Sequence, residues 1–233
     1  MKKTVFIILL IIFSSFSCKH LEEEKIINIS DQIEKANRNY RKIKSINYEK
    51  ISSFLTNSTL FYEKPNKIMF ETYYFNKKKL QIICDGVLFW FWIEQFDKKN
   101  AYYSKLEDLN KTRIKKSLRP DVLKTLVWVD ELDNYEIENN ELVIKEKNYK
   151  IKLNLKEGKV ISQKIEINSI PVLSVFTEEF QEINKIFVPK KIKVEWHEEK
   201  RKETIDLGIA KLNADIEIIE IPEELNKINL KNY

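Results

Sequence analysis

Residues 79–93 read KLQIICDGVLFWFWI, and this stretch decides the fold. Its two arms, Lys79–Cys84 and Leu88–Phe96, are rich in the aliphatic and aromatic residues that strands favour. Between them, Asp85-Gly86 is a pair that accepts positive φ in a tight turn. We therefore interpret this stretch as an antiparallel hairpin, and Asp85-Gly86 as a turn rather than a catalytic pair.

Runs with the same period of two extend on both sides of this hairpin. They are short, and turn residues such as Lys64-Pro65-Asn66 and Lys156-Glu157-Gly158 separate them. Short strands joined by tight turns are typical of an antiparallel meander. The further predicted strands are Ser45–Leu55, Ser58–Glu63, Lys67–Phe75, Ala101–Lys105, Tyr149–Leu155, Lys159–Ile167, Val172–Phe180, Ile192–His197 and Thr204–Ala210.

Two segments have helical spacing instead. In the first, Ser30 is suited to an N-cap, and a helix of about 12–15 residues is expected to follow it. In the second, Pro120 suits the first turn of a helix near residues 120–130. The apolar positions at spacings of three and four are Ile33, Ala36, Tyr40 and Ile43 in the first segment, and Val122, Leu123, Leu126, Val127 and Val129 in the second.

Together these elements predict a mainly β (α+β) fold. We expect a large curved antiparallel sheet, or incomplete β-barrel, of about ten or eleven strands with helices covering its concave face. No stretch rich in Pro, Gly or Ser divides the chain, so residues 30–233 are expected to form one domain. A sheet capped by helices encloses an apolar space, which is the usual shape of a lipid or acyl-chain binder.

Composition argues against several functional classes. The formal charge is +5, but Lys and Asp/Glu are interspersed, which favours a mixed surface over a nucleic-acid site. The two histidines, His20 and His197, cannot build a common multi-histidine metal site. There is no Gly-rich phosphate loop and no nucleophile elbow. Cys84 lies in an apolar run and is interpreted as a core residue. We expect no enzyme activity, metal or cofactor, although a carboxylate pair assembled by the fold stays open.

The N-terminus has the features of a secretory signal over residues 1–17. Lys2 and Lys3 precede the apolar run Val5–Phe13, whose nine residues are too few to span a bilayer, which takes roughly 20. The segment that ends at Cys18, Ser15-Phe16-Ser17-Cys18, resembles a bacterial lipobox, with departures at Ser15 and Phe16. We expect cleavage before Cys18, lipid (palmitate) attached to it, and a tether over residues 18–29. The alternative is ordinary signal cleavage nearby that leaves Cys18 a free thiol.

Five segments, in order along residues 30–223, resemble the lipoprotein-localisation fold of LolA, LolB and related lipoproteins. The opening is the first helix with Ile43-Lys44-Ser45-Ile46, and a proline-led strand begins at Lys64-Pro65-Asn66. Asp85-Gly86 is followed by alternating aromatic residues. A second proline-led strand contains Val188-Pro189-Lys190, and Leu212-Asn213 with Ile219-Glu220-Ile221-Pro222 resembles the closing segment. No residue that separates carriers from receptors has a counterpart here.

The resemblance implies a lipid-anchored binding protein for the acyl chains of lipids or lipoproteins, active in envelope transport or sorting. It implies a place in the bacterial cell envelope, on the outer membrane facing the periplasm, and a monomer. A non-transport interaction or sensor lipoprotein, or one with a vestigial cavity, is the alternative. Periodicity does not say which face of the aromatic strand points inward. The residues expected to face the cavity and its lid are Ile68, Phe70, Leu88, Trp90, Trp92, Val122 and Leu126.

Overall fold

The computed structural model describes residues 29–52, 57–75, 77–95, 98–112, 114–138, 141–145, 149–215 and 224–230. The predicted signal peptide, Cys18, nearly all of the tether and the closing segment at residues 219–222 lie outside these ranges. The described chain is mainly β, as the sequence predicts.

Within these ranges, fifteen strands form one large, curved sheet that does not close on itself. The first half contains β1 (Ser45–Ser52), β2 (Asn57–Glu63), β3 (Lys67–Tyr74), β4 (Lys77–Asp85), β5 (Leu88–Ile93) and β6 (Asn100–Lys105). The second half contains β7 (Tyr135–Glu138), β8 (Glu141–Lys145), β9 (Tyr149–Lys156), β10 (Lys159–Ile167), β11 (Ile170–Ile183), β12 (Ile186–Trp196) and β13 (Arg201–Asp206). Two short strands follow, β14 (Ala210–Leu212) and β15 (Asn226–Asn229).

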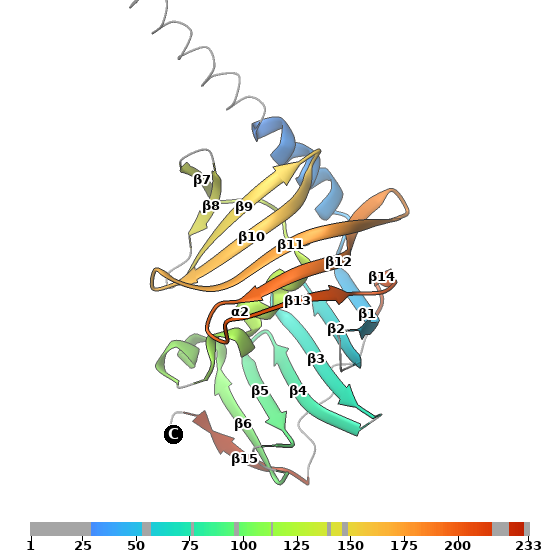
Figure 1. Ribbon diagram of the computed structural model, residues 1–233. Coiled ribbons are helices and arrows are strands. Elements are labelled where there is room, and N and C mark those ends of the chain that lie inside the picture. The colour runs from blue at the N-terminus through green and yellow to red at the C-terminus, as the bar shows by residue number, and fades with distance from the viewer. Residues whose placement is uncertain are drawn as a thin grey trace, which may run out of the picture.

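The two halves are consecutive meanders joined at β1. The strand order is β15-β6-β5-β4-β3-β2-β1-β13-β12-β11-β10-β9-β8-β7, with β14 paired to β1. Along β1, Ile46–Tyr48 pair with β14 and Ser52 pairs with Asp206 of β13. Figure 1 shows the first half in blue to green and the second in yellow to orange, with the sheet bent between them. The bend brings the concave faces of the two halves toward each other.

The first predicted helix is present at residues 29–40 and lies beside the second half of the sheet (Figure 1). Residues 29 and 30 are already helical, so Ser30 is inside the helix rather than its N-cap. Ile33, Ala36 and Tyr40 are buried, as the apolar stripe predicts. The side-chain hydroxyl of Tyr40 accepts a hydrogen bond from the backbone N–H of Val160 on β10 (3.2 Å).

Two asparagines on the same helix hold neighbouring backbone segments. Asn37 accepts from the N–H of Leu132 (2.7 Å) and donates to its carbonyl (3.4 Å). Asn39 accepts from the N–H of Phe187 and donates to its carbonyl, both at 2.9 Å. Each asparagine satisfies the donor and acceptor of one residue that is distant in sequence. The helix is thereby fixed to the sheet by polar as well as apolar contacts.

The second helical segment is shorter and less regular than the spacing predicts. It consists of the 3-10 turns η1 (Leu106–Lys111) and η2 (Lys116–Leu118), the helix α2 (Pro120–Leu123) and the 3-10 turn η3 (Lys124–Val127). Pro120 occupies the first turn of α2 as predicted, but Trp128 is extended, so the helix stops short of residue 130. Val122 and Leu126 belong to the main core with Ile68 and Phe89. The segment therefore packs against the concave face of the first half.

The sheet has more strands than the ten or eleven predicted from the sequence. The strands that the prediction missed are β7, β8, β14 and β15, each of three to five residues. Most residues of β7 are exposed, and glutamates occupy alternate positions in it. β7 therefore buries too few apolar side chains to give a clear period of two, and β8 buries three residues in a row, so it does not alternate.

Candidate functional site

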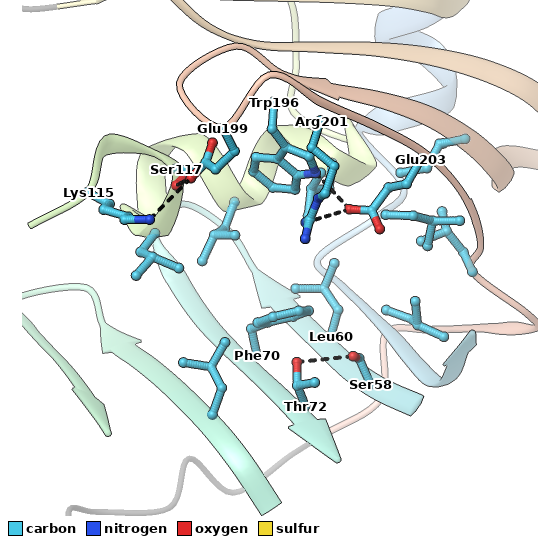
Figure 2. A pocket seen from close by; sticks show the side chains of 18 of the residues that line it. Ser58, Leu60, Phe70, Thr72, Lys115, Ser117, Trp196, Glu199, Arg201 and Glu203 are labelled. Atoms are coloured by element: carbon cyan, nitrogen blue, oxygen red, sulfur yellow. Dashed lines mark hydrogen bonds and ion pairs between the residues drawn. The ribbon is translucent and has the colours of Figure 1, made fainter. Parts of the chain in front are cut away.

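A pocket of about 980 Å³ lies between the two halves of the sheet (Figure 2). One wall is a row of side chains that crosses five strands at the outer end of the concave face. Cross-strand pairing places these residues next to each other in register, so they share one face. From β1 to β5 the row is Ile51, Ser58, Thr72, Leu80 and Ile93.

A second row of the same face, one step deeper, contributes Leu60 of β2 and Phe70 of β3. The residues paired further along this row, Ile82 and Phe91, are buried in the main core. The pocket is therefore the part of the concave face that the helical segment leaves uncovered.

The opposite wall comes from the second half of the sheet. Ile192 and Trp196 of β12 pair with Ile205 and Arg201 of β13, so all four share the pocket side. Glu203 lies between Arg201 and Ile205 on the same side of β13. This wall is apolar at one end and charged at the other.

The helical segment forms the third side. Leu118, Leu123 and Leu126 face the pocket, and Lys115 and Ser117 lie at its rim. The Ser117 hydroxyl donates to Glu199 Oε1 (2.9 Å), and Lys115 Nζ lies 3.9 Å from the same oxygen. Glu199 is in the turn between β12 and β13, so these contacts connect the helical segment to the opposite wall.

Two polar groups face each other across the apolar interior (Figure 2). On the first wall, the hydroxyls of Ser58 and Thr72 share a hydrogen bond (3.1 Å). On the second wall, Glu203 Oε1 accepts from Trp196 Nε1 (2.7 Å) and from Arg201 Nη2 (2.8 Å). The Arg201 guanidinium lies 5.8 Å from the centre of the Trp196 ring. Such a cavity, apolar with a few placed polar groups, is typical of small-molecule sites, which measure roughly 300–1,000 Å³.

Four of the seven residues predicted from the sequence lie on the pocket side of the fold. Phe70 and Leu126 line the pocket itself. Ile68 is on the same face of β3 as Phe70 but is one row deeper and fully buried, and Val122 is buried in the core behind the pocket.

The other three, Leu88, Trp90 and Trp92, point to the opposite, convex face, so the prediction that they face inward is wrong. The β4–β5 turn sets a register in which Cys84 pairs with Phe89 and Ile83 pairs with Trp90. This register turns Phe89, Phe91 and Ile93 toward the concave side. Trp90 packs in a second cluster with Phe61, Met69, Ile83 and Ala101, against which Trp92, Tyr103 and Leu225 lie. Leu88 is 42% exposed.

Sequence reasoning missed the polar residues of the pocket. Arg201, Glu203 and Ile205 alternate along β13, and Ile205 is the apolar member of that face. These residues could have been identified from the sequence, because two charged side chains lie on the same face of the strand as an apolar residue that points inward. Ser58 and Thr72 gave no such signal, because hydroxyl residues occur on both faces of strands.

The side chains of Cys84 and His197 both contact other residues of the sheet. Cys84 is fully buried in the main core, and burial raises the pKa of its thiol to about 11. His197 Nε2 is 2.9 Å from the Ser174 hydroxyl.

Within the described ranges, no group of three or more His, Cys, Asp or Glu residues could hold a metal ion. In the same part of the chain, no helix is long and apolar enough to cross a membrane.

No protein-family model matches the chain, and no curated protein sequence matches it significantly. Solved structures do resemble it. A DUF1329 family protein from Desulfovibrio piger has a TM-score of 0.50 at 10% identity, over 81% of this chain and 94% of the other.

Two further structures score slightly below 0.5. A proposed outer membrane lipoprotein-sorting protein domain from Vibrio parahaemolyticus has a TM-score of 0.48 at 7% identity, over 79% and 93% of the two chains. A LolA superfamily protein from Nitrosomonas europaea has a TM-score of 0.47 at 12% identity, over 80% and 94%. At 10% identity, the similarity to the DUF1329 family protein concerns the fold alone.

Proposed function

We propose that the protein binds the acyl chain of a lipid or lipoprotein in the pocket between the two halves of its sheet. The observation that supports this most directly is an apolar pocket of about 980 Å³, formed by Leu60, Phe70, Leu80, Ile93 and Leu126 among others. The resemblance of the sequence to the lipoprotein-localisation fold implies the same class of ligand.

The energetics of such binding are favourable without any specific contact. Each methylene group moved from water into an apolar site gains roughly 0.8 kcal/mol. A chain of about ten buried methylenes would gain roughly 8 kcal/mol before the costs of association.

The lipid anchor belongs to the same proposal. Lipid on Cys18 and a tether over residues 18–29 would hold the domain of residues 30–233 at a membrane of the bacterial envelope. The outer membrane, with the domain facing the periplasm, is the place that the family resemblance suggests. More than one acyl chain on Cys18 would make this anchoring stable, since a single chain binds a membrane only marginally. We propose that the protein acts as a monomer and binds no nucleic acid.

Native mass spectrometry of protein purified from its own host tests for the ligand. Co-purified lipid or acylated protein supports binding or transport. A chain that carries no ligand and binds no acyl probe would favour an interaction or sensor role instead.

Two variants of one strand test whether the pocket is the site. Ile93→Trp on β5 places a large ring in the pocket and is expected to weaken displacement of a fluorescent fatty-acid probe at least about tenfold. Leu88→Trp, on the opposite face of the same strand, is the matched control and is expected to bind as the unmodified protein does. Equal binding by both variants, with both folded by circular dichroism, would place the ligand elsewhere.

A further inference from the structure

The charged end of the β13 wall is unusual for an acyl-chain pocket. Arg201 and Glu203 lie on the same face of β13 as Ile205, which is the concave side of the sheet. They pair with Trp196 and Val194 of β12. Lys202, the residue between them, forms its ion pair with Glu195 (2.8 Å), with which it is in register. A polar group at the edge of an apolar cavity selects ligands by their polar end.

The geometry of Arg201 suits the binding of an oxyanion. One nitrogen, Nη2, is held by Glu203 Oε1 at 2.8 Å, and the guanidinium lies over the Trp196 ring. A guanidinium has five N–H donors in a planar fork. Within the described residues, Glu203 provides the one hydrogen bond of this group. Glu203 and Trp196 thus orient the guanidinium of Arg201, and most of its N–H donors remain available to a ligand.

The ion pairs at the pocket determine which charges can meet a ligand. Lys202 is neutralised by Glu195, which leaves two cations, Lys115 and Arg201, and two carboxylates, Glu199 and Glu203, in the lining. Lys115 is 3.9 Å from Glu199 and its side chain is 65% exposed, so this ion pair is loose.

The opposite wall offers a further donor. The two hydroxyls of Ser58 and Thr72 carry two protons, and their mutual hydrogen bond uses one of them. The second proton is available to an oxygen of a ligand. Figure 2 shows this pair across the pocket from Arg201, with Leu60 and Phe70 between the two polar groups.

We propose that Arg201 is the binding site for the anionic end, a carboxylate or a phosphate, of a long-chain amphiphile. The chain lies on Leu60, Phe70 and Leu126, and the Ser58–Thr72 pair binds an oxygen further along the ligand. This inference rests on the proposed function, because it assigns the polar end of a ligand whose chain occupies the same pocket. Glu203 and Trp196 act as positioning residues for the guanidinium.

The test compares ligands that share one chain and differ at the end. Palmitate, hexadecyl phosphate and hexadecanol are titrated against the full chain carrying Cys18→Ser, with inorganic phosphate alone as a fourth ligand. Palmitate or hexadecyl phosphate is expected to bind about tenfold more tightly than hexadecanol, equivalent to about 1.4 kcal/mol. Which of the two binds better identifies the anion. Inorganic phosphate is expected to bind weakly, because it lacks the chain.

Variants at two arginines connect this preference to the site. Arg201→Gln is expected to remove the preference for the anionic ligands and leave hexadecanol binding unchanged, whereas Arg201→Lys keeps part of it. Arg38→Gln is the matched control: Arg38 has a similar exposed fraction (63% against 60%) and also pairs with a glutamate, but lies on the N-terminal helix. A preference that survives Arg201→Gln, or is absent in the unmodified protein, would overturn the assignment. If none of the long-chain ligands binds, the proposed function fails as well.

A third variant separates an anionic from a cationic ligand end. Glu203→Gln removes the negative charge that competes with the ligand for Arg201, while its amide oxygen can still accept from Trp196 and from Arg201 and so keep the guanidinium in position. Binding of palmitate is expected to strengthen about threefold or more. A weaker affinity of this variant for palmitate would contradict the role given to Arg201. If the unmodified protein binds hexadecylamine more strongly than palmitate, the site binds a cationic ligand end at Glu203 instead.

Discussion

Asn37 shows how much of this fold depends on single polar side chains. Its amide pairs with both the N–H and the carbonyl of Leu132, which is 95 residues away in the sequence. The asparagine is almost fully buried, so water does not replace these bonds when they are lost. The contact fixes the chain immediately after the helical segment that borders the pocket.

We expect Asn37→Ala to lower the free energy of unfolding by about 1–3 kcal/mol, because it leaves buried backbone groups of Leu132 unpaired. Urea denaturation of the purified protein measures this change. The neighbouring exposed substitution Arg38→Ala should change stability by less than about 0.5 kcal/mol. Equal effects of the two substitutions would show that the bonds to Leu132 contribute nothing.

At the scale of elements, the N-terminal helix and the β9–β10 hairpin approach closely at one glycine. Gly158 has a φ of +70°, and its N–H donates to Gln32 Oε1 (2.6 Å). A Cβ added at this position would be 2.5 Å from the Cβ of Lys35. The hairpin turn can therefore contact the helix only because residue 158 has no side chain.

Gly158→Ala is expected to destabilise the protein by at least about 2 kcal/mol, through backbone strain and the clash with the helix. Gly86→Ala is the control, because Gly86 also has positive φ (+101°) but nothing within 4 Å of an added Cβ. Thermal unfolding of both variants measures the difference. A Gly86 variant as unstable as the Gly158 variant would assign the whole effect to backbone strain.

Elements were more predictable from the sequence than the direction in which their side chains point. The β4–β5 hairpin lies where Asp85-Gly86 predicts it, because turn chemistry is local. The inward face of β5 was not predictable, since both of its faces are apolar: the main core covers Phe89 and Phe91, and the second cluster covers Trp90. Only the pairing of β5 with β4 and β6, a property of the folded sheet, distinguishes the two faces.

The same limit applies to the pocket. Phe70 and Leu126 were identified as lining residues, but nothing local in the sequence joins them to Trp196 or Arg201 on the other half of the sheet. The short helix α2 also differs from the longer helix that the apolar spacing predicts. Tertiary contacts of Val127 and Trp128, both buried, replace the helical continuation.

At the scale of the whole molecule, the outer surface of the second half carries rows of alternating charge. Glu138 accepts hydrogen bonds from Lys145 (2.7 Å) and from Lys150, and these lower the pKa of its carboxyl to about 2. The pKa of Glu195 is lowered by its bond with Lys202, and that of Glu94 on the first half by its bond with Lys79. Unfolded glutamates have a pKa of about 4.3.

Carboxyls with a lowered pKa in the folded state stabilise the protein above the unfolded pKa, and this stabilisation is lost as the pH falls. We expect the urea midpoint to be steady from about pH 7 to 5.5 and to decrease as the pH falls from about 5 toward 2. Glu138→Gln should reduce the size of that decrease. Because these pairs are exposed, 1 M NaCl should reduce it too. A midpoint independent of pH over this range would contradict the assigned pKa shifts.

The position of the pocket between two meanders has a consequence for folding kinetics. Within each meander, neighbouring strands are also neighbours in sequence, so their pairing closes short loops. The joint is different: Ser45 of β1 contacts Ala214, 169 residues later. Contacts between residues so far apart in the chain form slowly. The pocket walls thus come together late in folding, and a ligand bound to both walls would retard their separation, so bound protein should unfold more slowly than free protein.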